Sequence, residues 1–383
     1  MCGIAAVISK IGTVSEHRTL VASMLNSIMH RGPDDHGLLI DQGKSSSVLG
    51  HCRLAIRKQE GVVQPCVSPC GRFVLLFNGE IYNDVALKKD LIAEGISCPY
   101  RSDTQILLCF LMRYGRTRLA ALNGMFAFLF FDRETGDWFA VRDRYGIKPL
   151  FYSFSEGKLL FASEIKALLV CGAIDRRFDP ASLGDYLTFQ VCVGKKTMFK
   201  DICKVEPGEC VYGNLDDVRG SSHYWSNSYA IDSSLTVDTV VEELEYLIVE
   251  AIGRQLVSDV PVGSYLSGGI DSSLIASICA GAHGKKMPMF HGRFAEPGFD
   301  ESRFAQLQSD HLGSVLYQSC SSSQDFIDSF ESLISCLDEP VAGPGAFPQQ
   351  VVSRLASQHV GVVMGGQGGD EIFCGYARYA IAC

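Results

Sequence analysis

Long apolar runs are absent from the sequence, which argues against a helix that spans a membrane. The longest nearly unbroken apolar stretch is Met125–Phe131, whereas a membrane-spanning helix needs about 20 such residues. The N-terminal residues also lack the basic segment that opens a secretory signal. The 15 cysteines are scattered, and their spacing forms neither a disulfide framework nor a paired zinc site. We therefore expect a cytoplasmic protein with no membrane partner.

Basic residues are scarce in the second half of the chain. Residues 1–210 contain 26 Lys and Arg against 22 Asp and Glu, while residues 211–383 contain 8 against 21, which together give the net charge of −9. Because residues 211–383 are strongly acidic, they would repel the phosphate groups of a nucleic acid. We therefore expect no nucleic-acid partner. The change in composition also predicts a domain boundary near residue 210.

The pattern of apolar residues predicts two domains. In residues 1–210, short apolar runs alternate with turn residues and a few amphipathic helices, which predicts a layered α+β domain. Residues 211–235 are polar and turn-rich, and we predict a linker there. In residues 236–383, predicted strands and helices alternate, which indicates an α/β domain with a parallel sheet. The apolar runs of the first half are Gly3–Ser9, Val48–Leu54, Phe73–Phe77, Phe126–Asp132, Trp138–Val141 and Leu150–Phe154.

A glycine-rich loop separates a predicted strand from a predicted helix in the second half. The strand Val262–Leu266 is followed by the loop Ser267–Ser273, which contains Gly268, Gly269 and Asp271. Consecutive glycines let backbone N–H groups approach an anion, and the helix N-terminus adds partial positive charge. No lysine follows, so this is not the loop of γ-phosphate transfer. A simple glycine turn with a serine N-cap is the alternative.

A second glycine loop, Gly365–Gly369, follows a predicted strand and leads into Asp370 and Glu371. Adjacent carboxylates at a helix start could hold Mg²⁺, although Asp370 could equally be an N-cap. Two such loops in one parallel sheet would both lie at the carboxyl ends of strands, where open α/β sheets bind ligands. Together they predict a nucleotide site.

Cys2 is a candidate N-terminal nucleophile. The small Gly3 after it favours removal of Met1, which would leave a free α-amine beside the thiol. With an amine pKa of about 7.7–8.0 and a thiol pKa of about 8.5, the amine can accept the thiol proton near neutral pH. The alternative is an inert strand residue.

Three further clusters could bind an amino-acid substrate. Arg53 offers a planar guanidinium for a carboxylate, and the Asn78 amide with the Gly79 N–H could form an oxyanion hole. Asp103 opens a predicted helix, where it could pair with an ammonium or cap the helix. Taken singly, Asn78 and Asp103 are more typical of turns and caps. The run His30–Asp35, taken alone, is a turn that ends the first helix.

Seven motifs in order carry a resemblance to a known family. The first five are similar to the class II glutamine amidotransferase domain: Cys2–Ile4, His30–Asp34, Asn78–Asn83, Ser102–Thr104 and Arg142–Leu150. With Ser267–Ser273 and Asp370-Glu371 downstream, the whole chain resembles the glutamine-hydrolysing asparagine synthetase family. The resemblance implies an αββα N-terminal-nucleophile fold for residues 1–210 and an ATP-pyrophosphatase domain, incomplete, for residues 236–383.

The resemblance also implies roles for residues. Cys2 would attack the glutamine amide, with Asn78 and Gly79 at the oxyanion. Glutamine would be bound by Arg53, Asn78, Glu80 and Asp103. The residues implied for ATP are Leu266, Ser267, Gly268, Gly269, Asp271, Ser272, Gly365 and Gly366, with Mg²⁺ on Asp271 and Asp370. The implied reaction converts aspartate to asparagine with release of AMP and pyrophosphate. A homodimer is a further expectation.

Three departures from the family pattern leave alternatives open. Gln367 stands where asparagine synthetases usually have Glu, and a Gln cannot act as a carboxylate base. The stretch Leu337–Phe347 lacks the Thr and Arg that those enzymes use around aspartate. The chain also stops at Cys383, whereas relatives continue, which predicts a fragment or a subunit completed by another chain. The alternatives are therefore another carboxylate acceptor, such as a sugar acid, or a truncated glutaminase or regulatory subunit without synthetase activity.

Overall fold

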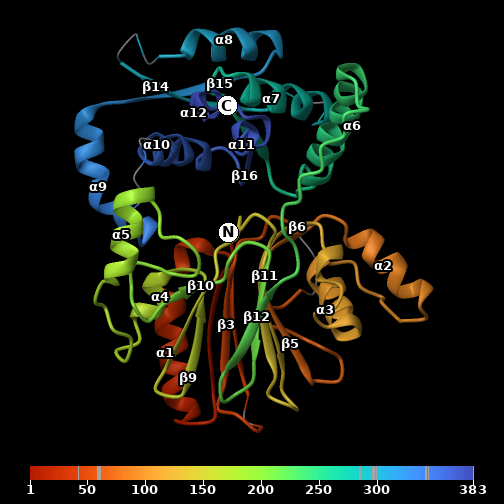
Figure 1. Cartoon of the computed structure of the whole chain (residues 1–383), viewed down its shortest axis with the longest axis vertical. Helices are drawn as coiled ribbons and strands as arrows, with labels where there is room; N and C mark the ends of the chain where they lie inside the picture. Colours follow the sequence, from red (N-terminus) through yellow and green to blue (C-terminus); the bar gives the residue numbers. More distant parts are fainter. Residues whose placement is uncertain are drawn as a thin grey trace. The chain divides into compact units, whose positions relative to one another are not determined.

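The computed structural model describes residues 1–41, 43–57, 62–283, 286–295, 298, 300–340, 343 and 345–382. The chain forms two compact units (Figure 1). The first comprises Met1–Ala55, Gln59–Tyr229 and Asp338–Pro340, and the second comprises Ile56–Lys58, Ala230–Leu337 and Val341–Cys383. Among the helices of the described residues, none is long and apolar enough to cross a membrane.

The first unit contains two antiparallel sheets of six strands each. The first sheet has the order β10-β8-β9-β1-β3-β2, with β1 (Gly3–Ser9), β2 (Asp35–Ile40), β3 (Val48–Arg53), β8 (Phe151–Ser155), β9 (Lys158–Ala162) and β10 (Cys203–Lys204). The second has the order β12-β11-β7-β6-β5-β4, with β4 (Cys66–Val67), β5 (Phe73–Ile81), β6 (Gly124–Asp132), β7 (Trp138–Arg142), β11 (Glu209–Gly213) and β12 (Val218–His223).

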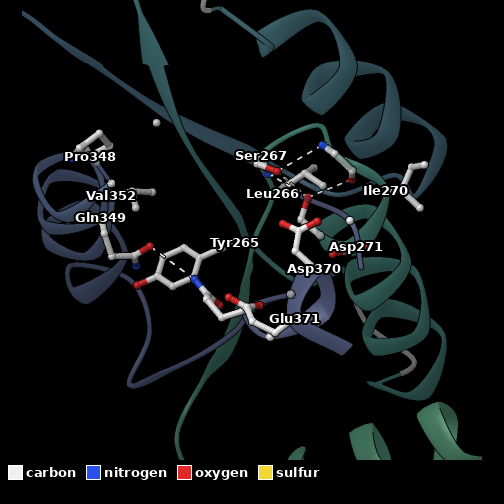
Figure 2. Close-up of a pocket in the computed structure, with 18 of the residues that line it drawn as sticks. Tyr265, Leu266, Ser267, Ile270, Asp271, Pro348, Gln349, Val352, Asp370 and Glu371 are labelled. Carbon is white, nitrogen blue, oxygen red and sulfur yellow. Dashed lines mark hydrogen bonds between the residues drawn. The ribbon is translucent and has the colours of Figure 1, made fainter. Parts of the chain in front are cut away.

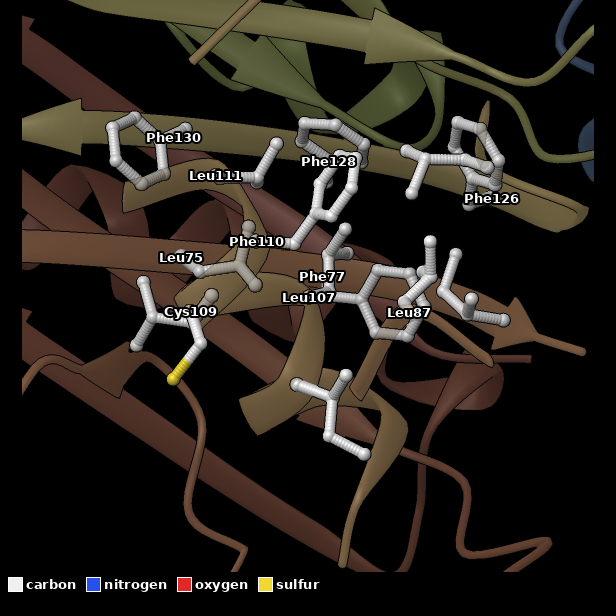
Figure 3. Close-up of a cluster of buried hydrophobic side chains, with 14 of the residues drawn as sticks. Leu75, Phe77, Leu87, Leu107, Cys109, Phe110, Leu111, Phe126, Phe128 and Phe130 are labelled. Atoms are coloured by element: carbon white, nitrogen blue, oxygen red, sulfur yellow. The ribbon is translucent and has the colours of Figure 1, made fainter. Parts of the chain in front are cut away.

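Both faces of each sheet in the first unit are buried. Alternate residues of a strand point to opposite faces. Ile4 and Ile8 of β1 therefore pack between the sheets, while Val7 packs on the opposite face beneath helix α1 (Val14–Ser27). The second sheet is covered on its outer face by α3, whose Leu107 and Phe110 contact Phe77 and its neighbours (Figure 3). The layers are therefore helix, sheet, sheet and helix, which confirms the predicted αββα fold.

Two helices that cover the sheets of the first unit, α1 and α3, begin at clear capping residues. Thr13 forms a capping box with Glu16 at the start of α1, and the Ser102 side chain accepts from the backbone N–H of Gln105 at the start of α3. The helices are α1 (Val14–Ser27), α2 (Asp84–Ala93), α3 (Asp103–Tyr114), α4 (Ile165–Leu169) and α5 (Pro180–Phe189), with 3₁₀ turns η1 (Met29–Arg31) and η2 (Leu119–Ala121).

The second unit is a parallel sheet covered by helices on both faces, as predicted. The strand order is β15-β14-β13-β16, with β13 (Val262–Tyr265), β14 (Met289–Phe294), β15 (Leu316–Ser321) and β16 (Val362–Met364). Ile252 of α6 and Cys279 of α7 pack on one face, and Val352 of α10 packs with Phe290 on the other. The helices are α6 (Val237–Gln255), α7 (Ile270–His283), α8 (Ser302–His311), α9 (Ser323–Leu337), α10 (Ala346–Ser357), α11 (Gly369–Phe373) and α12 (Ala377–Ala382).

Two segments differ from the sequence-based expectation. Strand β5 continues through Ile81 rather than ending at Phe77, so Asn78, Gly79 and Glu80 pair within the sheet instead of forming a turn. Strand β12 lies inside the predicted linker 211–235, and the change between the units falls later, at Tyr229 and Ala230. β12 is a polar, largely exposed edge strand, so it lacks the alternating apolar pattern that reveals a strand in a sequence.

Candidate active sites

Cys2 lies just before β1 in a half-buried position. Its sulfur accepts a hydrogen bond from the backbone N–H of Leu54 at 3.4 Å. Its carbonyl accepts one from Nε of Arg31 at 2.9 Å. Because β1 pairs with β3, Gly3 lies opposite Cys52, and Arg53 follows at the end of the same neighbouring strand.

Burial is the largest influence on the titratable groups at the N-terminus. Burial lowers the pKa of the α-amino group of Met1 to about 6, and Arg31 and Lys148 add to this while Cys2 opposes it. Burial raises the pKa of the Cys2 thiol, and the hydrogen bond from Leu54 and the nearby amine oppose that rise. The amine of Met1 is therefore largely unprotonated at neutral pH. It is a different group from the α-amine of Cys2, which becomes free only when Met1 is removed.

Arg31 is a functional candidate that the sequence did not single out, because its motif was interpreted as a turn. Its side chain is buried and pairs with Glu164 at 2.8 Å. Glu164 also contacts His30 at 3.0 Å and Lys166. Burial would raise the pKa of Glu164, but the hydrogen bonds from Arg31 and Lys166 outweigh it and hold the pKa below its usual value. The pair fixes the guanidinium that holds the Cys2 carbonyl.

Asn78 and Gly79 lie at the end of β5 that approaches the first sheet. The ring Nε2 of His51, on β3, is 3.0 Å from the carbonyl of Phe77, which ties this part of β5 to the strand next to Cys2. Asn78 is 1% exposed, and its Nδ2 has no hydrogen-bond partner among the described residues. A buried amide without a partner is costly, so it is typical of a group kept for a ligand.

Gly79 cannot be replaced without moving the backbone. A Cβ atom at this position would lie 2.2 Å from the carbonyl oxygen of Met125 and 2.6 Å from Cα of Phe126 on β6. Glycine therefore lets β6 pass close behind the Asn78-Gly79 pair.

The four residues predicted to bind glutamine lie on three elements, Arg53 on β3, Asn78 and Glu80 on β5, and Asp103 on α3. Arg53, half-buried at the end of β3, donates to the carbonyl of Val62 at 3.3 Å. Arg53 and Glu80 both perturb the pKa of the Cys2 thiol, so both lie within electrostatic range of it. Asp103, buried at the start of α3, accepts from the backbone N–H of Ile81 at 3.1 Å and of Thr104 at 2.6 Å. Asp103 thus links α3 to the end of β5, two residues beyond Gly79.

The first glycine loop of the second unit follows β13 directly. Leu266 is buried, and its carbonyl lies 2.8 Å from Nδ1 of His291. Gly268 has a φ of +100°, a conformation that favours glycine. The loop is closed by Ser272, whose Oγ lies 2.9 Å from Oγ of Ser267 and accepts from the Ser267 N–H at 3.1 Å.

The second glycine loop packs against the first, as the parallel pairing of β13 and β16 requires. A Cβ on Gly366 would lie 3.0 Å from Cβ of Asp271, and one on Gly369 would lie 2.2 Å from a carboxylate oxygen of the same residue. Both loops border a cavity of about 710 Å³ (Figure 2). Its lining includes Leu266, Ser267, Gly269, Asp271, Ser272, Gly366, Asp370 and Glu371 from the loops, and Tyr265, Phe290, Pro348, Gln349 and Gln367 around them.

A divalent cation is compatible with two of these residues. Asp271 and Asp370 both line the cavity from the two touching loops, and Mg²⁺ is usually bound by one or two carboxylates together with substrate phosphates. Within the described part of the chain, no group of three or more potential metal-ligating side chains occurs. The pair therefore fits a cation shared with a phosphate rather than an all-protein metal cage.

Comparisons with known proteins agree with the division into two units. Residues 1–225 match the glutamine amidotransferase domain family, and residues 243–382 match the asparagine synthase family. Asparagine synthetase [glutamine-hydrolyzing] 1 of Bacillus subtilis is 33% identical over 99% of this chain and 59% of that protein. Asparagine synthetase [glutamine-hydrolyzing] 3 of the same species is 30% identical over 100% of this chain and 64% of that protein.

This chain thus spans about three fifths of the length of the curated relatives it matches. Among solved structures, a glutamine phosphoribosylpyrophosphate amidotransferase from B. subtilis shows 19% sequence identity and a TM-score of 0.45, covering 84% of this chain and 82% of that one. A similarity of that size adds no argument about function.

Proposed function

We propose that this chain uses ammonia from glutamine to make an amide. It belongs to the glutamine-hydrolysing asparagine synthetase family through its two matched domains. The observation that carries the proposal is the buried Nδ2 of Asn78, which has no hydrogen-bond partner among the described residues and lies in a strand tied to the one beside Cys2. It is the arrangement expected of an oxyanion hole facing a nucleophile.

In the first unit, the thiol of Cys2 would attack the amide carbon of glutamine after Met1 is removed. The freed amine would take the thiol proton and then pass it to the departing ammonia. Asn78 Nδ2 and the backbone N–H of Gly79 would donate to the oxyanion. Water would then hydrolyse the glutamyl thioester. Arg53 would hold the α-carboxylate of glutamine, and Glu80 and Asp103 its ammonium.

In the second unit, the cavity beside the two glycine loops would bind ATP. Ser267, Gly269 and Ser272 would face the pyrophosphate, near the N-terminus of α7. Asp271 and Asp370 would hold Mg²⁺, which would neutralise phosphate charge as the acceptor carboxylate attacks the α-phosphorus. The products of that step are an acyl-adenylate and pyrophosphate, and ammonia then displaces AMP. Because ammonium is not a nucleophile, the ammonia must arrive unprotonated.

Aspartate is the default acceptor, since the relatives are named asparagine synthetases. A second candidate is a different carboxylate, such as a sugar acid. It is favoured by the polar side chains of Tyr265, Gln349 and Gln367 in the cavity lining. Gln367, from the second glycine loop, donates to Gln349 at 3.4 Å, and the hydroxyl of Tyr265 lies 2.8 Å from that of Ser353. Amides and hydroxyls of this kind suit a substrate rich in hydroxyl groups.

The proposed function is tested by incubating the protein with MgATP, glutamine and each carboxylate in turn. AMP, pyrophosphate and an amide of one acceptor are expected in equal amounts, and the productive acceptor distinguishes the two candidates. Release of ADP would contradict adenylation. Production of glutamate without any nucleotide turnover would support glutamine hydrolysis and contradict the proposed amide synthesis.

A further inference from the structure

A short segment directly after helix α9 belongs to the first unit. Asp338–Pro340 is grouped with the first unit, although Leu337, the last residue of α9, belongs to the second. Asp338 has no part in the proposed chemistry, and its φ is +63°. This backbone conformation is strained for a residue with a side chain, although Asp and Asn tolerate it better than most. Such strain persists only where the surrounding contacts impose it, so the contacts of Asp338 are informative.

The carboxylate of Asp338 is held by Lys166, near the start of α4. Its Oδ2 accepts from the backbone N–H of Lys166 at 3.1 Å, and Nζ of the same lysine lies 3.0 Å from Oδ1. Only 10% of the Asp338 side chain and 23% of the Lys166 side chain are exposed. Because water screens these charges little, each depends on the other for neutralisation.

Lys166 also connects Asp338 to the proposed nucleophile. Its Nζ contacts the carboxylate of Glu164, whose Oε1 accepts from Nη1 of Arg31 at 2.8 Å. Nε of Arg31 in turn donates to the carbonyl of Cys2 at 2.9 Å. Asp338, Lys166, Glu164 and Arg31 therefore form a continuous chain of alternating charges that ends on the backbone of Cys2.

Glu164 is shared between Lys166 and Arg31, so the charge on Asp338 affects how it is divided. Burial would lower the pKa of Lys166, but the hydrogen bonds to Glu164 and Asp338 outweigh it and raise the pKa above its usual value. Without the charge of Asp338, Glu164 would be the only carboxylate on Lys166 among the described residues. Glu164 would then be drawn towards Lys166, and its hold on the Arg31 guanidinium would weaken.

We propose that Asp338 is a positioning residue of the glutaminase site, which fixes Cys2 through Lys166, Glu164 and Arg31. The inference rests on the proposed function, because it concerns the same nucleophile. The role of Asp338 is indirect, since its contacts reach Cys2 only through the other three side chains. The residues proposed to bind glutamine lie on β3, β5 and α3, outside this chain of charges. Loss of Asp338 should therefore lower kcat and leave KM nearly unchanged.

Glu339, the next residue in the segment, provides a matched control. Its Oε1 accepts from the backbone N–H of Met198 at 2.5 Å and lies 3.8 Å from the sulfur of Cys192. Burial raises the pKa of Glu339, as it raises that of Asp338. The two carboxylates share a segment and a partly buried environment, but of the two only Asp338 binds Lys166 in the described part of the chain. Loosening of the whole segment would affect both variants, whereas loss of the charge chain would affect only one.

The test uses Asp338→Asn, because asparagine keeps the shape, tolerates the same backbone conformation and removes one charge. Asp338→Gly, which also suits a positive φ, is a second variant without the carboxylate. Glu339→Gln is the control, and Glu164→Gln, alone and combined with Asp338→Asn, completes a double-mutant cycle. Glutaminase kcat and KM are measured for each protein. Hydrogen exchange of the N-terminal peptide reports local opening around Cys2, and the melting temperature reports folding.

We expect both Asp338 variants to lower kcat by about 10-fold with KM changed by less than about twofold, and to speed exchange of the N-terminal peptide. Glu339→Gln should change none of these. In the Glu164→Gln background, Asp338→Asn should have little further effect, because the chain of charges is already interrupted.

Three results would overturn the inference: an equal loss of kcat in Glu339→Gln, independent effects of the two substitutions in the double variant, or unchanged kcat and exchange in both Asp338 variants. If the unaltered protein does not hydrolyse glutamine, the proposed function fails, and the exchange rates across the cycle alone still decide whether Asp338 positions Cys2.

Discussion

Replacement of Asn78 by alanine should lower the rate of glutamine hydrolysis without lowering the stability of the protein. The Nδ2 group that the variant loses has no hydrogen-bond partner among the described residues, although the side chain is 1% exposed. In the proposed mechanism that group gains its partner only when the oxyanion forms. Its loss should therefore reduce kcat for glutamine hydrolysis by about 10²–10³-fold, or roughly 3–4 kcal/mol of transition-state stabilisation.

The same variant should be nearly as stable as the unaltered protein. Removing an unsatisfied buried amide relieves a desolvation cost of about 1–3 kcal/mol, which offsets the cost of the small cavity left behind. We expect the melting temperature to change by no more than about 3 °C, which corresponds to roughly 1 kcal/mol for a unit of this size.

Asn83→Ala is the matched control, because it removes the same side chain from a site where the amide is bonded. Asn83 Nδ2 donates to the carbonyl of Ala121 at 2.9 Å, and its Oδ1 accepts from the N–H of Asn123 at 3.0 Å. That variant should lose about 1–2 kcal/mol of stability and keep its kcat. The assay is glutamate release with thermal unfolding of both variants. An Asn78→Ala protein that keeps kcat within threefold, or that melts well below Asn83→Ala, would refute the reasoning.

Three further predictions follow from the same geometry. Arg53→Lys and Asp103→Asn should raise KM for glutamine more than they lower kcat, because they weaken binding of the substrate's charged groups; unchanged KM values would make these residues structural. Asp271→Asn should remove ATP-to-AMP turnover and leave glutamine hydrolysis intact, and loss of both activities would contradict the assignment of the two reactions to separate units. Nucleotide binding should require Mg²⁺. Because the α-amine of Cys2 must be neutral to act as the base, and the ordinary pKa of an α-amine is about 7.7–8.0, glutaminase activity should fall as the pH drops below that range; activity that stays constant from pH 8 down to pH 5 would contradict its role as base.

Much of the fold is predictable because both units bury their strands in regular patterns. β1 (Gly3–Ser9) and β6 (Gly124–Asp132) are almost wholly buried, so their apolar runs stand out from the turns around them. The alternation of strands and helices after residue 236 likewise predicts the parallel sheet. The apolar pattern does not predict edge strand β12, because an exposed strand needs no apolar face.

The glutaminase residues are predictable individually, but their arrangement is not. Asn78 and Gly79 were expected after a strand, whereas pairing with β6 continues through them. That pairing depends on Gly79 having no Cβ in contact with Met125 and Phe126, a long-range contact that no local pattern encodes.

Arg31 is recognisable in the sequence only as part of a motif. Its position depends on Glu164, and the Arg31–Glu164 pair joins residues 133 positions apart in the chain. Charge pairs of this kind become visible only when the strands and loops that carry them are placed in space.

The central claim, that Cys2 is the nucleophile which releases ammonia from glutamine, is tested most directly by Cys2→Ala. Glutamate release from glutamine should be compared in the two proteins after mass spectrometry has shown that Met1 is absent from the unaltered one. Loss of the covalent nucleophile should reduce glutaminase activity by at least about 10³-fold, while amide formation from added ammonia should continue at the rate of the unaltered protein. Glutaminase activity retained in the alanine variant would contradict the account.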